Sequence, residues 1–298
     1  MELVTVADQP EPFDASCYSH LENGNALFFP KTPITFTPEE LEFLLGQRQS
    51  GAAYHKNIAY RPSKDLLTGV AAGGDRDHLK AILRKFSQQS VALLTRLLPR
   101  YAASWRVDFT SFRPLEEAGR QLSVHSRNDL LHVDAFPTRP TNGDRILRFF
   151  TNINPTQSRV WNTTDSFEVL VEQLSDEARL TDTARSASSS LRRSLAGVAR
   201  GLGLRQFGAA PYDILMHRLH NFMKENQKFQ DACRKDRWEF PPSSSWMVFT
   251  DAVGHSVLSG QFALEQTFII AHRAMQHPER APVSVLERIT GMRLTWAQ

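Results

Sequence analysis

Residues 130–155 read LLHVDAFPTRPTNGDRILRFFTNINP, and the pattern of this stretch decides how the chain is expected to fold. His132 and Asp134 lie two residues apart in an apolar run, a turn follows, and a second apolar run begins at Arg145. Residues i and i+2 project from the same face of a β-strand, so the imidazole and the carboxylate are expected side by side. Burying them together is costly unless a metal cation or a hydrogen bond between them compensates. The stretch therefore predicts either a metal site or a hydrogen-bonded pair.

Runs of similar character on both sides of this stretch predict further strands. They are rich in β-branched and aromatic residues and are separated by turn residues. They comprise residues 103–115, 119–127, 130–136, 145–155, 158–164 and 245–270. Helical spacing predicts helices at 37–49, which starts with a capping box, at 76–101, and at 283–289. Residues 1–36 look irregular apart from a short strand at 26–30.

The order of these elements predicts one domain. The chain is helical again from about residue 165 to 237, between two groups of predicted strands. We therefore expect a mainly β fold with helices (α+β), in which a single domain spans residues 1–298. Its core would be an antiparallel barrel or sandwich. Helices would support one side of it, and a helical insertion would occupy about residues 165–240.

Charge and composition narrow the class of protein. The formal net charge of the 298 residues is +3, which favours anionic partners but is too weak to indicate nucleic-acid binding. Cys17 and Cys233 are far apart and fit a reducing compartment. The acidic N-terminal residues do not resemble a secretory signal, and no apolar run is long enough to span a membrane. We expect a cytoplasmic protein, and the sequence leaves open a contact with a membrane surface.

A third ligand would turn the His-x-Asp pair into a metal centre. Two histidines and one carboxylate form the facial triad that binds Fe(II) and leaves three coordination positions open. His255 lies in a later strand-like run, between glycines that would permit tight turns near a metal. His217 and His220 are rival ligands, three residues apart on a predicted helix, but solvated or hydrogen-bonded helix histidines are the simpler interpretation.

The chain resembles the Kdo 3-hydroxylases, which are Fe(II)/2-oxoglutarate-dependent oxygenases acting on the Kdo sugar of lipopolysaccharide. Three segments carry the resemblance, namely YHKNIAYRP at 54–62, the stretch at 130–155, and WMVFTDAVGHSVLSGQFALEQTF at 246–268. The resemblance implies a double-stranded β-helix core of the jelly-roll or cupin-like type. It implies His132, Asp134 and His255 as iron ligands, with 2-oxoglutarate and O₂ as co-substrates. It also implies hydroxylation at C3 of Kdo to give Ko.

The distal carboxylate of 2-oxoglutarate needs a cation or strong donors. Many enzymes of this superfamily place an Arg or Lys about ten residues after the distal histidine, whereas this chain has Gln266 in that neighbourhood. Strand alternation would put Arg148, Phe150 and Asn152 on one face, from which an inward arginine could pair with the carboxylate in a bidentate manner. Candidate anchors are Arg148, Gln266, Asn152, Arg145 and Arg273.

The implied substrate, Kdo-lipid A or a related sugar, is itself an anion. The candidate contacts are His55, Lys56, Asn57 and Arg61 in the first resembling segment, and Arg127 and Arg139 beside the metal motif. Basic residues at 192–205 alternate with leucine and valine, a pattern that predicts a peripheral contact with a membrane surface.

Three other functions share these residues. The first is an Fe(II)/2-oxoglutarate oxygenase with another small molecule or a protein as its substrate. The second is a non-catalytic β-barrel binding protein, in which His132 and Asp134 only hydrogen-bond. The third is a zinc hydrolase, which is disfavoured because no glutamate is placed as a general base near the motif, and catalytic zinc more often takes three histidines or two histidines and a glutamate.

Overall fold

The computed structural model describes residues 1–6, 12–50, 57–189 and 208–296. Its helices are α1 (Ala15–Glu22), α2 (Pro38–Leu45), α3 (Arg76–Leu97), α4 (Pro99–Ala102), α5 (Phe167–Leu174), α6 (Leu180–Ala187), α8 (Pro211–Glu225), α9 (Gln227–Ala232) and α10 (Pro282–Thr290). Its strands are β1 (Leu3–Thr5), β2 (Ala26–Phe29), β3 (Ile58–Arg61), β4 (Leu66–Thr68), β5 (Arg106–Arg113), β6 (Arg145–Asn152), β7 (Arg159–Ser166), β8 (Asp236–Phe240), β9 (Ser245–Phe249), β10 (Val253–Ser259) and β11 (Ala263–Ile270).

Two sheets form the β-structure. The larger sheet has the order β1-β2-β9-β6-β11-β5-β3-β4, and the smaller has the order β10-β7-β8. Strands β1 and β2 are parallel, whereas the other paired strands are antiparallel. Aromatic rings pack between the two sheets. The ring centroid of Trp161 in β7 lies 5.0 Å from that of Phe150 in β6 and 5.7 Å from that of Trp246 in β9. The two sheets therefore pack face to face.

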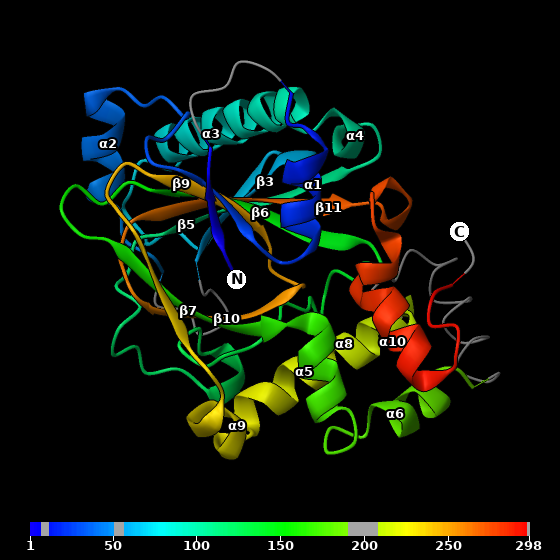
Figure 1. Ribbon diagram of the computed structural model, residues 1–298. Coiled ribbons are helices and arrows are strands. Elements are labelled where there is room, and N and C mark those ends of the chain that lie inside the picture. The colour runs from blue at the N-terminus through cyan, green and yellow to red at the C-terminus, as the bar shows by residue number, and fades with distance from the viewer. Residues whose placement is uncertain (7–11, 51–56, 190–207, 297–298) are drawn as a thin grey trace.

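Helix α3 covers the other face of the larger sheet, and Figure 1 shows it above β3, β5 and β6. Strand alternation explains how one strand serves both layers. On β6, Leu147 and Phe149 join the apolar cluster that contains Leu83 and Phe86 of α3, while Phe150 joins the cluster between the sheets. Arg148 lies on the same side of β6 as Phe150, so its side chain enters the space between the sheets.

Helices α5, α6, α8 and α9 lie between β7 and β8 in the sequence. Figure 1 shows them with α10 at the end of the molecule opposite α3. They share one apolar cluster with α10, to which Leu131 and Val133 of the His-x-Asp segment also belong. The helical part ends at Ala232 and β8 begins at Asp236, so the predicted insertion at 165–240 extends too far by one strand.

Several local predictions need correction. Residues 119–127 contain only a single 3-10 turn, Val124–Ser126, where a strand was expected. The N-terminal region expected to be irregular contains α1, which begins at Ala15. The N-cap Asp14 accepts hydrogen bonds from Ser16 N and Cys17 N. The prediction of a mixed α+β fold is confirmed, and the capping box at Thr37 and Glu40 is present.

Candidate metal centre and its pocket

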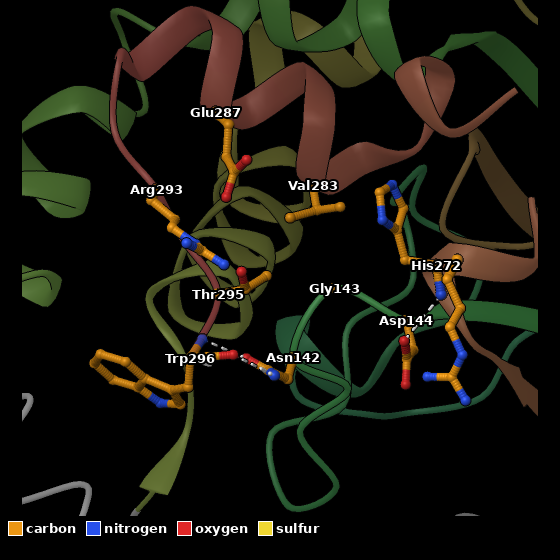
Figure 2. A pocket seen from close by; sticks show the side chains of 10 residues that line it. Asn142, Gly143, Asp144, His272, Val283, Glu287, Arg293, Thr295 and Trp296 are labelled. Atoms are coloured by element: carbon orange, nitrogen blue, oxygen red, sulfur yellow. Dashed lines mark hydrogen bonds between the residues drawn. The ribbon is translucent and has the colours of Figure 1, made fainter. Parts of the chain in front are cut away.

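Two cavities of the described chain are lined by residues that the sequence singled out. One, of about 270 Å³, lies beside α10 and is lined by Asp144, Arg273 and Arg293 among others (Figure 2). The other has a volume of about 630 Å³ and is lined by residues of both sheets and of α8. His132, Asp134 and His255 all line the larger cavity, which is therefore the candidate site.

The three predicted ligands converge in this cavity. One ligand atom from each of His132, Asp134 and His255 lies within 4.8 Å of the others, and all three residues are buried. Asp134 Oδ1 is 3.7 Å from Nε2 of His132 and 4.0 Å from Nε2 of His255. Oδ1 of Asp134 therefore faces both imidazole nitrogens, while Oδ2 is turned towards Arg148. A carboxylate oxygen and two imidazole nitrogens that converge in this way are the donor set of the 2-His-1-carboxylate triad, so the three residues fit a metal ion.

Backbone hydrogen bonds hold the ligands in position. His132 N donates to His255 O at 3.0 Å, His255 N donates to His132 O at 2.9 Å, and Asp134 N donates to Thr250 O at 2.9 Å. The His-x-Asp segment is therefore held by β10 of the smaller sheet and by Thr250, which directly follows β9 of the larger sheet. Gly254 lets β10 pack closely against the Thr164 side chain of β7, because a Cβ at position 254 would lie only 2.6 Å from Thr164 Cγ2.

The hydrogen bonds of each ligand imidazole also determine its tautomer. Nδ1 of His132 is 2.7 Å from Leu130 O, and Nδ1 of His255 is 3.1 Å from Val253 O. A carbonyl oxygen can only accept, so each Nδ1 carries the proton and each Nε2 lone pair faces Asp134. Metal-binding histidines are commonly oriented in this way by a backbone carbonyl.

The charge states suit metal binding as well. Burial lowers the pKa of both His132 and His255, so both rings are neutral at pH 7. Burial alone would raise the pKa of Asp134, but the Arg148 guanidinium beside it and the two imidazoles hold that pKa well below its usual range. Neutral imidazoles and an ionised carboxylate are the forms that bind a metal.

Helix α8 supports the metal motif but contributes no ligand to this cluster. Nδ1 of His220 donates to Val133 O at 2.7 Å, and its ring centroid lies 4.9 Å from that of His132. The ring of His217 is stacked on that of His220, with 6.4 Å between the ring centroids. Both line the cavity, so the rival ligands predicted from the sequence form one wall of the pocket.

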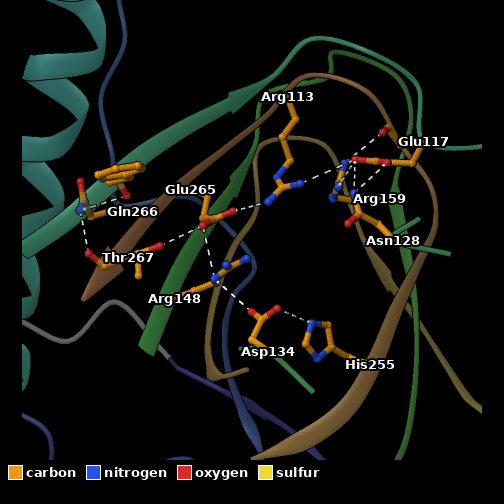
Figure 3. Close-up of polar contacts among 12 residues, drawn as sticks. Arg113, Glu117, Asn128, Asp134, Arg148, Arg159, His255, Glu265, Gln266 and Thr267 are labelled. Atoms are coloured by element: carbon orange, nitrogen blue, oxygen red, sulfur yellow. Dashed lines mark hydrogen bonds and ion pairs between the residues drawn. The ribbon is translucent and has the colours of Figure 1, made fainter. Parts of the chain in front are cut away.

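A chain of ion pairs crosses the floor of the pocket (Figure 3). Nε of Arg148 lies 3.2 Å from Asp134 Oδ2 and 3.4 Å from Glu265 Oε1. Glu265 also accepts a hydrogen bond from Arg113 at 2.5 Å, and Glu117 pairs with Arg113 and Arg159. Arg148, Arg113 and Arg159 line the cavity, so its floor carries three guanidinium groups connected by acidic side chains.

Four of the five predicted co-substrate anchors do not line the pocket. Arg145 lies on the α3 side of β6, fully buried, in a bidentate pair with Asp251. Gln266 points away because Glu265 and Thr267 of β11 face the cavity, and its amide bonds to β5 instead. The Asn152 amide donates to backbone oxygens of Gln157 and Phe240. Arg273 lines the smaller cavity.

The predicted substrate contacts divide in a similar way. Asn57, Arg61 and Arg139 line the pocket, whereas the partly buried Arg127 pairs with Asp129 at 2.5 Å and does not line it. His55 and Lys56 lie outside the described residues, as does the basic segment at 192–205.

Sequence reasoning missed several residues of the pocket. They are Phe109, Arg113, Phe136, Arg159, Glu265 and Thr267. Alternation along β5 and β11 could have paired Phe109 with Ser111 and Arg113, and Glu265 with Thr267. It could not have shown which face of each strand is turned towards the smaller sheet.

Comparison with known protein families shows to which family the chain belongs. Residues 5–293 match the family described as 3-deoxy-D-manno-oct-2-ulosonic acid (Kdo) hydroxylase. The chain belongs to the Kdo hydroxylase family. Among curated proteins, none matches the sequence.

Solved structures of the Kdo hydroxylase KdoO, a non-heme Fe(II) alphaketoglutarate-dependent dioxygenase, are similar to this chain. The apo enzyme is 33% identical with a TM-score of 0.84, and its complex with cobalt(II) is 34% identical with a TM-score of 0.85. The complex with alphaketoglutarate and Fe(III) is 33% identical with a TM-score of 0.83. Each match covers 99% of this chain and 98% of the other.

This Kdo hydroxylase family member is therefore an Fe(II)- and 2-oxoglutarate-dependent dioxygenase. The predictions of a double-stranded β-helix core, of an oxygenase, and of Fe(II), 2-oxoglutarate and O₂ as cofactor and co-substrates are confirmed. The matches do not support a non-catalytic binding protein or a zinc hydrolase. None of the described helices has the length and apolarity needed to cross a membrane.

Proposed function

We propose that the enzyme hydroxylates C3 of the Kdo sugar of Kdo-lipid A, giving Ko together with succinate and CO₂. Two findings support this: the family match along residues 5–293, and a large cavity that brings the three predicted ligands together. The observation that carries the proposal is the buried cluster of His132, Asp134 and His255 beside the pocket arginines. A bound Fe(II) would supply the oxidising chemistry there, with 2-oxoglutarate and O₂ as co-substrates.

We assign distinct tasks to the side chains of the pocket. His132, Asp134 and His255 would hold the metal through Nε2 and carboxylate oxygens, and the carbonyl bonds at Nδ1 keep both rings oriented. Arg148 would anchor the distal carboxylate of 2-oxoglutarate, because it is the one predicted anchor that lines the pocket and it lies beside Asp134. Asn57, Arg61 and Arg139 would contact the anionic sugar.

The anchor can be tested by comparing two arginines of the same strand. Arg148→Gln should raise the KM for 2-oxoglutarate by about tenfold or more, since a charge-assisted hydrogen bond contributes about 1.5–3 kcal/mol. Arg145→Met is the matched control, because its side chain faces the opposite side of β6. An effect of Arg145→Met on the KM for 2-oxoglutarate, with none of Arg148→Gln, would refute the assignment.

The reaction itself is tested by mass spectrometry of Kdo-bearing lipid A. The lipid is incubated with the purified protein, Fe(II), 2-oxoglutarate and air, with one control that lacks 2-oxoglutarate and another that contains His132→Ala. We expect one added oxygen in the complete reaction and none in the controls. Succinate released with iron bound but no oxygen added to the lipid would retain the oxygenase and exclude this sugar. It would favour another small-molecule or protein substrate.

We further propose a cytoplasmic location. The support is chemical, because Cys17 and Cys233 are both free thiols, as expected in a reducing compartment. A peripheral contact with the inner face of the inner membrane stays a prediction from residues 192–205. Flotation with anionic liposomes tests it, and Arg192→Glu with Arg193→Glu should reduce retention.

A further inference from the structure

The wall of the pocket contains a ladder of alternating guanidinium groups and aromatic rings. The Arg61 guanidinium lies 4.8 Å from the centroid of Phe109, and that of Arg139 lies 4.2 Å from the same ring. Arg139 also lies 3.9 Å from the centroid of Phe136, over which Arg148 lies at 5.4 Å. All five side chains line the cavity. The ladder therefore runs along the pocket from Arg61 to Arg148, which is beside the metal ligand Asp134.

The three cations of the ladder differ in their acidic partners. Arg148 pairs with Asp134 and Glu265, and Arg139 pairs with Asp108. Arg61 makes no ion pair with any described residue, and its buried Nε has no hydrogen-bond partner among them. A buried donor without a partner is costly, so a ligand that supplies an acceptor would bind Arg61 favourably.

The rings explain how Arg61 can be held without an acidic partner. A guanidinium over an aromatic face is stabilised by the ring and keeps its N–H donors available for a bidentate acceptor. Phe109 contacts both Arg61 and Arg139, so one apolar ring stabilises two positive groups that would otherwise repel each other. A carboxylate suits such a fork of donors well.

We propose that Arg61, positioned by Phe109, is the subsite for the carboxylate of the sugar, while Arg148 at the other end of the ladder serves the co-substrate. This inference rests on the proposed function, whose substrate is an ulosonic acid and therefore carries a carboxylate. The two anions then occupy opposite ends of the ladder, with Arg139 and both rings between them. The separation prevents the sugar from competing for the site of 2-oxoglutarate.

The test is a binding cycle that changes the protein and the ligand. Calorimetry measures the affinity of Co(II)- and 2-oxoglutarate-loaded protein for the methyl glycoside of Kdo and for its carboxyl methyl ester. We expect esterification to weaken binding to the wild type by about tenfold or more. With Arg61→Gln, acid and ester should bind with equal, weak affinity. Phe109→Leu should weaken binding of the acid more than that of the ester.

Two controls make the result specific. Arg293→Gln changes an exposed arginine that lines the smaller cavity and makes no ion pair with any described residue, so it should leave every affinity unchanged. The affinity of Co(II)-loaded Arg61→Gln for 2-oxoglutarate should equal that of the wild type, which also shows that the variant is folded. Arg148→Gln should lose affinity for 2-oxoglutarate.

Each remaining outcome overturns a defined part of the argument. If esterification weakens binding equally in the wild type and in Arg61→Gln, Arg61 does not hold the carboxylate. If Arg61→Gln loses affinity for 2-oxoglutarate, the two ends of the ladder are assigned the wrong way round. If the wild type binds 2-oxoglutarate but neither sugar, the proposed substrate itself is wrong, and the carboxylate subsite is withdrawn with it.

Discussion

Asp251→Asn should destabilise the protein strongly without weakening the binding of 2-oxoglutarate. Asp251 accepts from Arg145 Nε at 2.9 Å, from Arg145 Nη2 at 3.2 Å and from Ile146 N at 3.2 Å. Both side chains of the ion pair are 0% exposed, and the guanidinium lies 4.3 Å from the centroid of Phe249. The asparagine would keep an acceptor for Ile146 N but would leave the buried guanidinium without a counter-charge.

The expected cost follows from that unpaired charge. Removing one partner of a buried ion pair costs about 3–5 kcal/mol. For a chain of this length each kcal/mol lowers Tm by about 2 °C, so Asp251→Asn should lower Tm by about 6–10 °C. The double variant Arg145→Met with Asp251→Asn should recover most of this loss, because the buried charge is then absent.

Thermal unfolding followed by circular dichroism measures the effect. Glu239→Gln is the control, since it removes the partner of Arg237 in a pair whose side chains are both 57% exposed and should change stability by less than about 1 kcal/mol. Calorimetry at a temperature well below Tm should find wild-type affinity for 2-oxoglutarate in all three variants. Equal shifts for Asp251→Asn and Glu239→Gln, or a double variant no more stable than Asp251→Asn, would refute the reasoning.

Three further predictions concern the metal centre and its surroundings. Co(II) at about 100 times its Kd should stabilise the wild type by about 2.7 kcal/mol, and this Tm increase should be absent in His132→Ala and in wild type treated with a chelator. Gly254→Ala should cost about 1–3 kcal/mol and weaken Co(II) binding, because its Cβ would overlap Thr164, whereas Gly74→Ala has room and should stay within about 0.5 kcal/mol of wild type. Both effects are read from Tm and Co(II) titrations, and similar losses in the two glycine variants would contradict the explanation. Burial and Lys224 lower the pKa of His220 to about 3, whereas an unfolded histidine titrates near 6.5, so the metal-free protein should lose stability as pH falls below 6.5. Urea unfolding between pH 7.5 and 5.5 should show a shallower loss for His220→Gln, by at most about 1.4 kcal/mol per pH unit, and an unchanged slope would count against this pKa.

Local patterns predicted the elements whose signals lie within a few residues. The capping box at Thr37 and Glu40 and the apolar spacing of α3 need no distant contact, and both are present. Strand β8 was missed, because it follows directly on helical sequence and its residues alternate only between half-buried and exposed before the buried Phe240. Residues 119–127 alternate like a strand but form none. Arg120 of this segment pairs instead with Glu117, whose carboxylate also accepts a hydrogen bond from Asn128.

The sequence by itself determined which side chains lie together near the His-x-Asp pair. The spacing of His132 and Asp134 placed two candidate ligands side by side, and the alternation on β6 placed Arg148 on the side of Phe150 rather than with Arg145. His255 was a candidate from its place in a later strand-like run, and the resemblance implied it as the third ligand together with the chemistry. These inferences need only the two-residue period of a strand and a motif of fixed spacing.

Only the tertiary structure decided which face of each strand lines the pocket. Gln266 was a reasonable anchor from its position, yet the register of β11 between β5 and β6 turns Glu265 and Thr267 inward and Gln266 towards Thr110. Arg145 and Arg148 are three positions apart on one strand and face opposite sides of it. Arg145 pairs with Asp251 on the α3 side, whereas Arg148 pairs with Asp134 in the candidate metal centre. The period of a strand says which side chains share a face, but the packing of the second sheet and of α3 decides which face is the inside of the site.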